Sequence, residues 1–476
     1  MASIGTDTFF ANVSELNAGL KAREFSAEDL ARAFADRLMQ LGPRYNALVL
    51  PLRQEALRQA KDVDKDLKRE RFRGPLQGIP YGVKDLLALT GHPTTWGAMP
   101  YAGQVFDYTA TVIQKLAAVG AVLTGKLSMV ELAGGGGYRF PSASLTGPGL
   151  NPWDRSRWSG GSSSGSAAAV AAGLVPFAIG SETSGSIVTP ASFCGVTALR
   201  PTYGLVSRHG AMALSWTLDK LGPFARSAED CGIVLQAIAG KDSKDSGSAG
   251  KSFYYTPQYA RAMKDLRVGY APADFAEWAE PATRPAFEAA IAVLRASGMQ
   301  FVETRLPDFP YGAALSTILA GEMGSIFEPL IASGKVEELA DKPQIAGLKA
   351  SLELPAKDYL RAMRLRRLIQ EQVGSLFGTV DVLLAPGRAA VAPKIDTPLD
   401  RGGGGAASPK DPGFRSIIPM GNLAGLPALV LPCGFADNLP VALQVVGVPF
   451  SENTLLAIGR EFQARTDWHK RRPPAA

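Results

Sequence analysis

Two runs of serine and glycine are the first candidates for chemistry. SGGSSSGSAAAVAAG spans Ser159 to Gly173, and SGS occupies Ser184 to Ser186. A serine hydroxyl becomes a nucleophile when a neighbouring base removes its proton. A flexible linker is a poor interpretation, because the segment that follows, AAAVAAGLVPFAIG, is apolar enough for a core. We therefore expect the glycines to be positional, allowing backbone conformations and approaches that a Cβ would block.

A histidine base has little support. GSSSG at Gly161 to Gly165 matches the G-x-S-x-G nucleophile elbow, which would make Ser163 the nucleophile. That elbow requires a hydrophobic strand before it, where this chain has NPWDRSRW. Of the histidines His92, His209 and His469, only the last two follow the serine.

Phosphate and metal chemistry are also disfavoured. GAVLTGK, from Gly120 to Lys126, matches the start of a phosphate-binding loop, but Leu127 stands where Ser or Thr must bind magnesium. No cluster of His, Cys, Asp and Glu has the spacing of metal ligands. The sequence predicts neither a metal nor a cofactor.

A lysine is the remaining candidate base. Lys84 lies in QGIPYGVKDLLALTG, with apolar residues on both sides. Burial among such residues lowers the pKa of a lysine towards neutrality, and Ser-Lys pairs are a variant of the catalytic triad. An ion pair with Asp85 or another acid is the alternative role for this lysine.

Composition indicates a globular α/β protein. Of the 476 residues, 46% are apolar and 20% are charged, so there is ample material for a core. The net charge of +6 is scattered, and its clearest cluster, HKRR at His469 to Arg472, is read as a solvated tail. Nucleic-acid binding usually needs a concentrated basic face, so we expect no nucleic-acid partner.

The cysteines and the N-terminus indicate the compartment. Cys194, Cys231 and Cys433 are odd in number and lack metal spacing, which favours a reducing cytoplasm. The first residues, MASIGTDTFFANVSEL, carry no signal-peptide pattern. No apolar run is long enough to span a membrane. We expect a cytoplasmic protein without a membrane partner.

The elements that must position these residues follow an α/β pattern. Up to about Glu70 the spacing is helical, and FSAEDLARAFADRL begins with a capping box of Ser26 and Asp29. From Pro75 apolar strands alternate with helices such as PAFEAAIAVLRASG and KDYLRAMRLRRLIQEQVGSLF. That alternation predicts a mixed or mostly parallel sheet covered by helices. The strand candidates are ALVL, GAVLTG, LVPFAIG, RVGYAP, QFVETRL, VDVLLAP, PALVLPC and VALQVVG.

Several long segments resemble the amidase signature family. They are GIPYGVKD, GAVLTGKLSMVELA, the serine-rich stretch from SGGSSSG to SRHG, LDKLGPFARSAEDC, DVLLAP and NLAGLPALVLPCGF. Together they cover about residues 75–235 and 380–465. The resemblance implies a three-layer α/β/α fold with a mixed central sheet. It also implies hydrolysis of a carboxylic amide without metal or cofactor. We expect a helical segment, 1–70, packed on the family's domain, 71–476, the two forming one structural domain.

The resemblance assigns roles to individual residues. Lys84 matches the family's base, Ser162 the bridging serine whose peptide bond is cis, and Ser186 the nucleophile. In this arrangement neutral Lys84 takes the proton of Ser162, which takes that of Ser186. The backbone N–H groups of Thr183, Ser184, Gly185 and Ser186 would form the oxyanion hole.

The chain departs from the family at the nucleophile. The usual segment is D-T-G-G-S-I-R, whereas Glu182, Ser184 and Val188 replace its Asp, its first Gly and its Arg. The hydrogen bonds behind the triad must therefore differ. Ser163 is open to two interpretations, as support for Lys84 or Ser186 or as a helix cap.

The substrate is expected to be a small molecule. GGGGYRF, Gly134 to Phe140, and the glycines at 402–405 are expected to flank the mouth of the site, and apart from Arg139 they offer no charged clamp. This favours a neutral, partly apolar arylamide, anilide or carbamate (urethane). The alternative is the glutaminase (A-type) subunit of a tRNA-dependent amidotransferase. An inactive scaffold is disfavoured, because all triad positions are occupied. The enzyme is expected to be a monomer or homodimer, and the loop Arg401 to Gly413 either a mobile lid or an ordinary disordered excursion.

Overall fold

The computed structural model describes residues 4–399 and 413–474. Within these ranges eleven strands form one mixed sheet, in the order β1-β3-β2-β6-β8-β7-β12-β13-β11-β9-β10, and β4 pairs with β5 in a separate ribbon. The strands are β1 (Leu48–Pro51), β2 (Pro80–Lys84), β3 (Val122–Leu127), β4 (Leu150–Asn151), β5 (Asp154–Trp158), β6 (Phe177–Glu182), β7 (Thr197–Arg200), β8 (Lys220–Ala225), β9 (Arg267–Tyr270), β10 (Gln300–Glu303), β11 (Val382–Pro386), β12 (Ala428–Ala436) and β13 (Leu439–Gly447).

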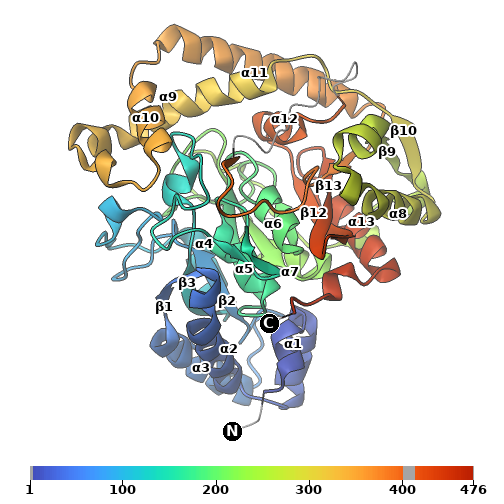
Figure 1. Ribbon diagram of the computed structural model, residues 1–476. Coiled ribbons are helices and arrows are strands. Elements are labelled where there is room, and N and C mark those ends of the chain that lie inside the picture. The colour runs from blue at the N-terminus through green and yellow to red at the C-terminus, as the bar shows by residue number, and fades with distance from the viewer. Residues whose placement is uncertain (1–3, 400–412, 475–476) are drawn as a thin grey trace.

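Thirteen α-helices surround the sheet in the described residues (Figure 1). They are α1 (Val13–Ala22), α2 (Ala27–Leu41), α3 (Arg53–Lys68), α4 (Thr111–Ala118), α5 (Ser164–Ala171), α6 (Val188–Cys194), α7 (Ala228–Ile238), α8 (Arg284–Ala296), α9 (Tyr311–Ala332), α10 (Lys342–Ser351), α11 (Ala356–Leu376), α12 (Ile417–Ala424) and α13 (Glu452–Arg465).

Side chains of the central strands alternate between the two faces of the sheet. On β6, Phe177 and Ile179 pack into one core cluster and Ala178 into another. This period of two is the geometry of a strand buried on both sides. One face is covered by α4, α7, α8 and α13, and the other by α5 and α6 and, further along the sheet, by α9, α11 and α12. The expected three-layer α/β/α fold with a mixed sheet is confirmed.

The parallel part of the sheet positions the residues of interest. Strand β2 lies parallel to both β3 and β6, whereas β6 is antiparallel to β8. Carboxyl ends of parallel strands meet at one edge of a sheet, where ligands commonly bind. Lys84 is the last residue of β2, and the segment after Glu182, at the end of β6, carries the SGS run.

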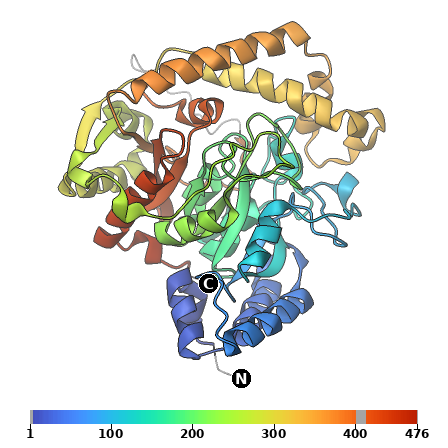
Figure 2. The ribbon, with the colours of Figure 1, turned by 180° about the vertical axis from the view of Figure 1, so that it is seen from behind.

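The N-terminal residues form helices and one strand of the sheet. Ser26 and Asp29 make the expected capping box at the start of α2. Leu30 and Phe34 of α2 join the same core cluster as Tyr81 of β2, and β1 pairs with β3. Figures 1 and 2 show this region at the opposite end of the molecule from the long helices α9 and α11. The boundary at residue 70 stays a prediction.

Several local elements differ from those expected from the sequence. GAVLTGK forms most of strand β3 and not a phosphate-binding loop. Strands β2, β7 and β8 were absent from the strand candidates, because Pro and Gly interrupt β2 and β8 and β7 is short. No helix in the described part of the chain is long and apolar enough to cross a bilayer. The loop Arg401 to Gly413, expected to be either a lid or a disordered excursion, falls almost entirely on residues 400–412, which lie outside the described residues.

Candidate active site

Lys84 is the centre of a buried group of hydroxyls. Its Nζ lies 2.7 Å from Oγ of Ser162, 3.1 Å from Oγ of Ser163 and 2.8 Å from Oγ of Ser181. The Lys84 side chain is fully buried. The structure therefore brings together the first two predicted triad residues, and it adds Ser181, which the sequence did not single out.

Burial lowers the pKa of Lys84 to about 7, against the opposing influence of the carboxylates of Asp219 and Glu182. A buried ammonium loses its hydration, so the neutral amine is favoured. Above pH 7 this lysine is then mostly uncharged and able to accept a proton.

The alternative role for Lys84, an ion pair, is wrong. Asp85 pairs instead with Lys126 of β3, at 2.7 Å. Among the ion pairs of the described residues none includes Lys84. Lys126 is also the lysine of GAVLTGK, the segment that matched a phosphate-binding loop, and it is engaged in this ion pair.

The backbone conformation before α5 places Ser162 beside Lys84. The peptide bond between Gly161 and Ser162 is cis, as the resemblance implies. Gly160 has a φ of 85°, and a Cβ there would lie 2.6 Å from Cα of Pro190. A side chain is therefore excluded at this position, which explains why the serine-rich run has a glycine at residue 160.

Ser163 supports the lysine and does not cap the helix. Its Oγ accepts a hydrogen bond from Lys84 at 3.1 Å and donates one to the carbonyl oxygen of Ser181 at 3.1 Å. Although Ser163 occupies the N-cap position of α5, its side chain makes no capping hydrogen bond. No histidine of the described residues bonds to it, so the elbow interpretation gains nothing from the structure.

Ser186 closes the turn between β6 and α6 and is 8% exposed. In the described residues its hydroxyl has no hydrogen bond to Ser162. Gly185, just before it, has a φ of 85°, a conformation that glycine adopts without strain. Ser184 is half-buried.

The carboxylate of Glu182 stabilises the turn between β6 and α6. Its Oε2 accepts hydrogen bonds from the backbone N–H groups of Ile187, at 2.8 Å, and Val188, at 3.0 Å. Its Oε1 accepts from Arg200 of β7, at 2.7 Å, and from Asn422 of α12, at 2.8 Å. The carboxylate thus ties the two residues after the candidate nucleophile to two other elements. These four hydrogen bonds are the network behind the turn in this chain, and its difference from the family pattern stays a prediction.

Glu182 and Arg200 are both fully buried. Burial alone would raise the pKa of Glu182, but Arg200, Lys220 and the hydrogen bond from Asn422 lower it to about 2. The carboxylate is therefore ionised at any working pH.

Thr183 is fixed through its side chain. Its Oγ1 donates to Asp219 at 2.5 Å, and the second oxygen of Asp219 accepts from the N–H groups of Leu214, at 2.8 Å, and Ser215, at 2.9 Å. Burial raises the pKa of Asp219 against these hydrogen bonds. The first peptide unit of the candidate oxyanion turn is thereby anchored to the segment that precedes β8.

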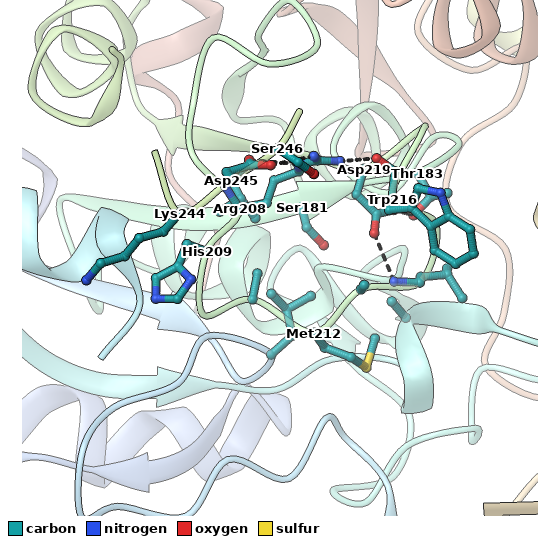
Figure 3. Close-up of a pocket in the computed structure, with 16 residues that line it drawn as sticks. Ser181, Thr183, Arg208, His209, Met212, Trp216, Asp219, Lys244, Asp245 and Ser246 are labelled. Carbon is teal, nitrogen blue, oxygen red and sulfur yellow. Dashed lines mark hydrogen bonds and ion pairs between the residues drawn. The ribbon is translucent and has the colours of Figure 1, made fainter. Parts of the chain in front are cut away.

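Two cavities flank the turn. The Met212 cavity, of about 180 Å³, is lined by Ser181 and Thr183 together with Leu86, Met212, Leu214 and Trp216. In Figure 3 the lining residue Ser181 lies between Met212 and the Arg208–Asp245 ion pair. The Ile418 cavity, of about 260 Å³, is lined by Ser184 and Gly185 together with Thr189, Trp278, Arg388, Arg415 and Ile418.

The segment Gly134 to Phe140 lies beside the site. A Cβ on Gly161 would lie 3.1 Å from the hydroxyl oxygen of Tyr138. The N–H groups of Arg139 and Phe140 donate to Asp341, at 2.6 and 2.9 Å. The second segment expected at the mouth, 402–405, lies outside the described residues.

No group of three or more His, Cys, Asp or Glu side chains in the described part of the chain could hold a metal ion. The groups around Lys84 that are candidates for catalysis are hydroxyls, the lysine amine and backbone N–H groups.

Residues 29–456 match the Amidase family. The chain belongs to the amidase signature family. The match includes all the positions discussed above, from Lys84 to Asn422, and its span agrees with the segments that carry the resemblance.

Relatives within the family have different activities. The A subunit of the glutamyl-tRNA(Gln) amidotransferase of Chloroflexus aggregans is 38% identical, with 99% of each chain covered. The peptide amidase of Stenotrophomonas maltophilia is 31% identical, with a TM-score of 0.83 and 98% of each chain covered. A chain from a vestigial protein complex that reveals the origins of an s-triazine catabolic enzyme is 31% identical, with a TM-score of 0.86 over 96% of this chain and 98% of that one. These relatives establish an amidase-type hydrolase and leave its substrate open.

The sequence reasoning missed Ser181, Asp219, Arg200 and Asn422. No sequence signal pointed to Ser181, because its position beside Lys84 depends on the pairing of Ile179 with Val83 in the folded sheet. The other residues reach the site from β7, from the segment before β8 and from α12. Their sequence separations, up to 240 residues, leave no local pattern.

Proposed function

We propose that this enzyme hydrolyses a neutral, partly apolar carboxylic amide, anilide or carbamate through an acyl-enzyme on Ser186. The observation that carries the proposal is the environment of Lys84. A fully buried amine with a pKa of about 7 lies 2.7 Å from the hydroxyl of Ser162 and has no carboxylate partner in the described residues. Such an amine has the proton affinity that a general base needs near neutral pH.

In the first half of the reaction, Lys84 Nζ takes the proton of Ser162, and Ser162 takes the proton of Ser186. The Oγ of Ser186 attacks the carbonyl carbon, and the negative charge on the carbonyl oxygen is stabilised by the N–H groups of Thr183 to Ser186, each worth roughly 3 kcal/mol. The C–N bond then breaks, and the nitrogen receives its proton from Ser162, which recovers one from Lys84. The amine leaves and the acyl group stays on Ser186.

In the second half, water takes the place of the amine. The relay removes a proton from the water, whose oxygen attacks the acyl carbon, and the bond to Ser186 breaks as Oγ regains a proton. The relay needs a hydrogen bond between Ser186 and Ser162 in the reacting complex. Catalytic hydrogen bonds often form only once substrate is bound, and this step is compatible with the position of Ser186 described above.

The lining of the Met212 cavity supports a neutral substrate. Half of the lining side chains are apolar, and Arg208 is already paired with Asp245 at 2.7 Å. The carboxylate of Asp219 is likewise occupied by Thr183, Leu214 and Ser215. A cationic substrate group would have to displace one of these partners, because neither carboxylate of the lining is free.

The second candidate is a glutaminase subunit of a tRNA-dependent amidotransferase. The whole-length similarity to A subunits supports it more directly than it supports the first candidate. The guanidinium groups of Arg388 and Arg415 on the Ile418 cavity would suit the α-carboxylate of glutamine. The described lining of that cavity includes no carboxylate for the α-ammonium group.

One experiment tests the mechanism and separates the candidates. The purified chain is assayed on nitroanilides, aryl carbamates, aliphatic amides and glutamine, and a fluorophosphonate-labelled sample is mapped by peptide mass spectrometry. We expect label on Ser186 and turnover of anilides or carbamates, with Ser186→Ala lowering the rate by roughly 10⁴ to 10⁶. Label on Ser163, with activity retained in Ser186→Ala, would restore the elbow mechanism. Ammonia release from glutamine only with amidotransferase partner subunits would favour the second candidate.

A further inference from the structure

We propose that the Met212 cavity binds the amine that leaves, that the Ile418 cavity binds the acyl part, and that the amine is a neutral single-ring aromatic amine. The proposal rests on the function proposed above and deepens it. It assigns each end of the substrate to its own side of the turn that carries Ser186.

The turn separates the two cavities. Ser181 and Thr183 line the Met212 cavity, whereas the next two residues, Ser184 and Gly185, line the Ile418 cavity. No described residue lines both. A carbonyl group held by the N–H groups of this turn therefore has one substituent directed towards each cavity.

The proton relay decides which substituent goes where. The nitrogen that leaves must receive a proton through Ser162 and Lys84. Lys84 lies between Ser162, at 2.7 Å, and Ser181, at 2.8 Å, and Ser181 is a wall of the Met212 cavity (Figure 3). None of the hydroxyl partners of Lys84 lines the Ile418 cavity, so the C–N bond, whose nitrogen takes its proton from Lys84 through Ser162, points towards the Met212 cavity.

The lining and the volume define the class of amine. Leu86, Met212 and Leu214 are buried apolar residues, and Trp216, 41% exposed, stands at the rim. A dry apolar cavity of about 150 Å³ accepts benzene, so about 180 Å³ is enough for one aromatic ring. The unpaired ammonium of a charged diamine would have no free carboxylate there, because Asp219 and Asp245 are already engaged. A neutral arylamine fits both conditions.

The test fills each cavity separately. Met212→Trp narrows the first cavity and Ile418→Trp the second, while Leu360→Trp, on an exposed site of α11, is the matched control. Each protein is assayed on an anilide and a primary amide that share one acyl group, and on two nitroanilides that differ only in acyl length. A folded state is checked by thermal unfolding.

We expect Met212→Trp to lower the ratio of kcat/KM for the anilide over that for the primary amide by roughly tenfold or more, as a lost ring site of 1–3 kcal/mol requires. Ile418→Trp should instead lower the ratio for the long over the short acyl chain. Leu360→Trp should alter neither ratio. If both cavity variants change the same ratio, or if Met212→Trp affects anilide and primary amide equally, the assignment is overturned.

An independent measurement follows the acyl-enzyme. With aniline added, the wild-type acyl-enzyme should partition between hydrolysis and anilide formation, because the aniline occupies the cavity that it leaves in the forward reaction. Met212→Trp should reduce the anilide fraction roughly tenfold relative to wild type. An unchanged fraction would contradict the proposal even with Ser186 labelled by fluorophosphonate. Loss of labelling at Ser186 would instead mean that the proposed function itself is wrong.

Discussion

The side chains of Asp85 and Lys126 form an ion pair of 2.7 Å in which neither is exposed to solvent. Asp85 follows Lys84 directly in the chain, so it is the first carboxylate that could have neutralised the lysine. Lys126 and the N–H and hydroxyl of Thr95 occupy it instead. Lys84 is left with hydroxyl partners, which lets burial lower its pKa.

Lys84→Arg should abolish most of the activity. Arginine keeps a positive charge but cannot act as a base, because its pKa stays above 12. We expect kcat to fall by roughly 10³-fold or more, within the range for removal of a general base and its coupled nucleophile. Steady-state assays on a nitroanilide measure the loss, and thermal unfolding verifies the fold. A folded arginine variant with near wild-type activity would defeat the mechanism even if Ser186 is the nucleophile.

The rate should increase with pH through an apparent pKa of about 7, the value for Lys84 in the folded protein. Below it the amine is protonated and cannot accept the proton of Ser162, and above it kcat/KM should reach a plateau. A carboxylate base would reach its plateau by roughly pH 6. The profile is measured with a neutral anilide, so that the substrate does not titrate. A flat profile from pH 6 upward would exclude the lysine base.

Stability should also respond to this lysine. Between about 7, its folded pKa, and about 10.4, its pKa in an unfolded chain, the unfolded state binds a proton that the folded state does not. The free energy of unfolding should therefore increase with pH in this window, by up to roughly 1.4 kcal/mol per pH unit. Below pH 7 both states are protonated and the dependence disappears.

Lys84→Met is the comparison for that experiment. Urea titrations of both proteins from pH 6 to pH 10 give the difference in the free energy of unfolding at each pH. The difference should change across the window if Lys84 causes the dependence. Parallel curves would show that the lysine has an ordinary pKa in the folded protein.

Glu182→Gln should destabilise the protein strongly. The substitution leaves the buried charge of Arg200 without its partner, which costs roughly 3–5 kcal/mol. Urea unfolding measures the loss. Glu371→Gln, in an exposed pair with Arg367, is the control and should cost below about 1 kcal/mol. Equal effects of the two substitutions would refute a special role for the buried pair.

The fold class could be predicted from the alternation of apolar strands and helices together with the resemblance to the family, and the pairing of Lys84 with Ser162 from that resemblance alone. It could not reveal Ser181 as a partner of Lys84, since that contact depends on the register between β2 and β6. The partners of Glu182 were equally hidden, because Arg200 and Asn422 come from different elements. The Pro and Gly residues of β2 and β8 obscured two central strands. Tertiary contacts, and not propensity, decided these features.

The residues that line the two cavities come from different segments of the chain. The Met212 cavity is built largely from the segment 208–221 and from 244–246, whereas the Ile418 cavity is built largely from 386–388 and 415–419. Lys84, Ser162 and Ser186 lie outside all of these segments. Apart from Asp219, which anchors Thr183, residues of one wall can thus mutate without altering the other wall or the reacting groups. Related enzymes can therefore keep the same reacting groups while they change the specificity for either half of the substrate. In protein engineering, libraries of the residues that line each cavity can be combined independently.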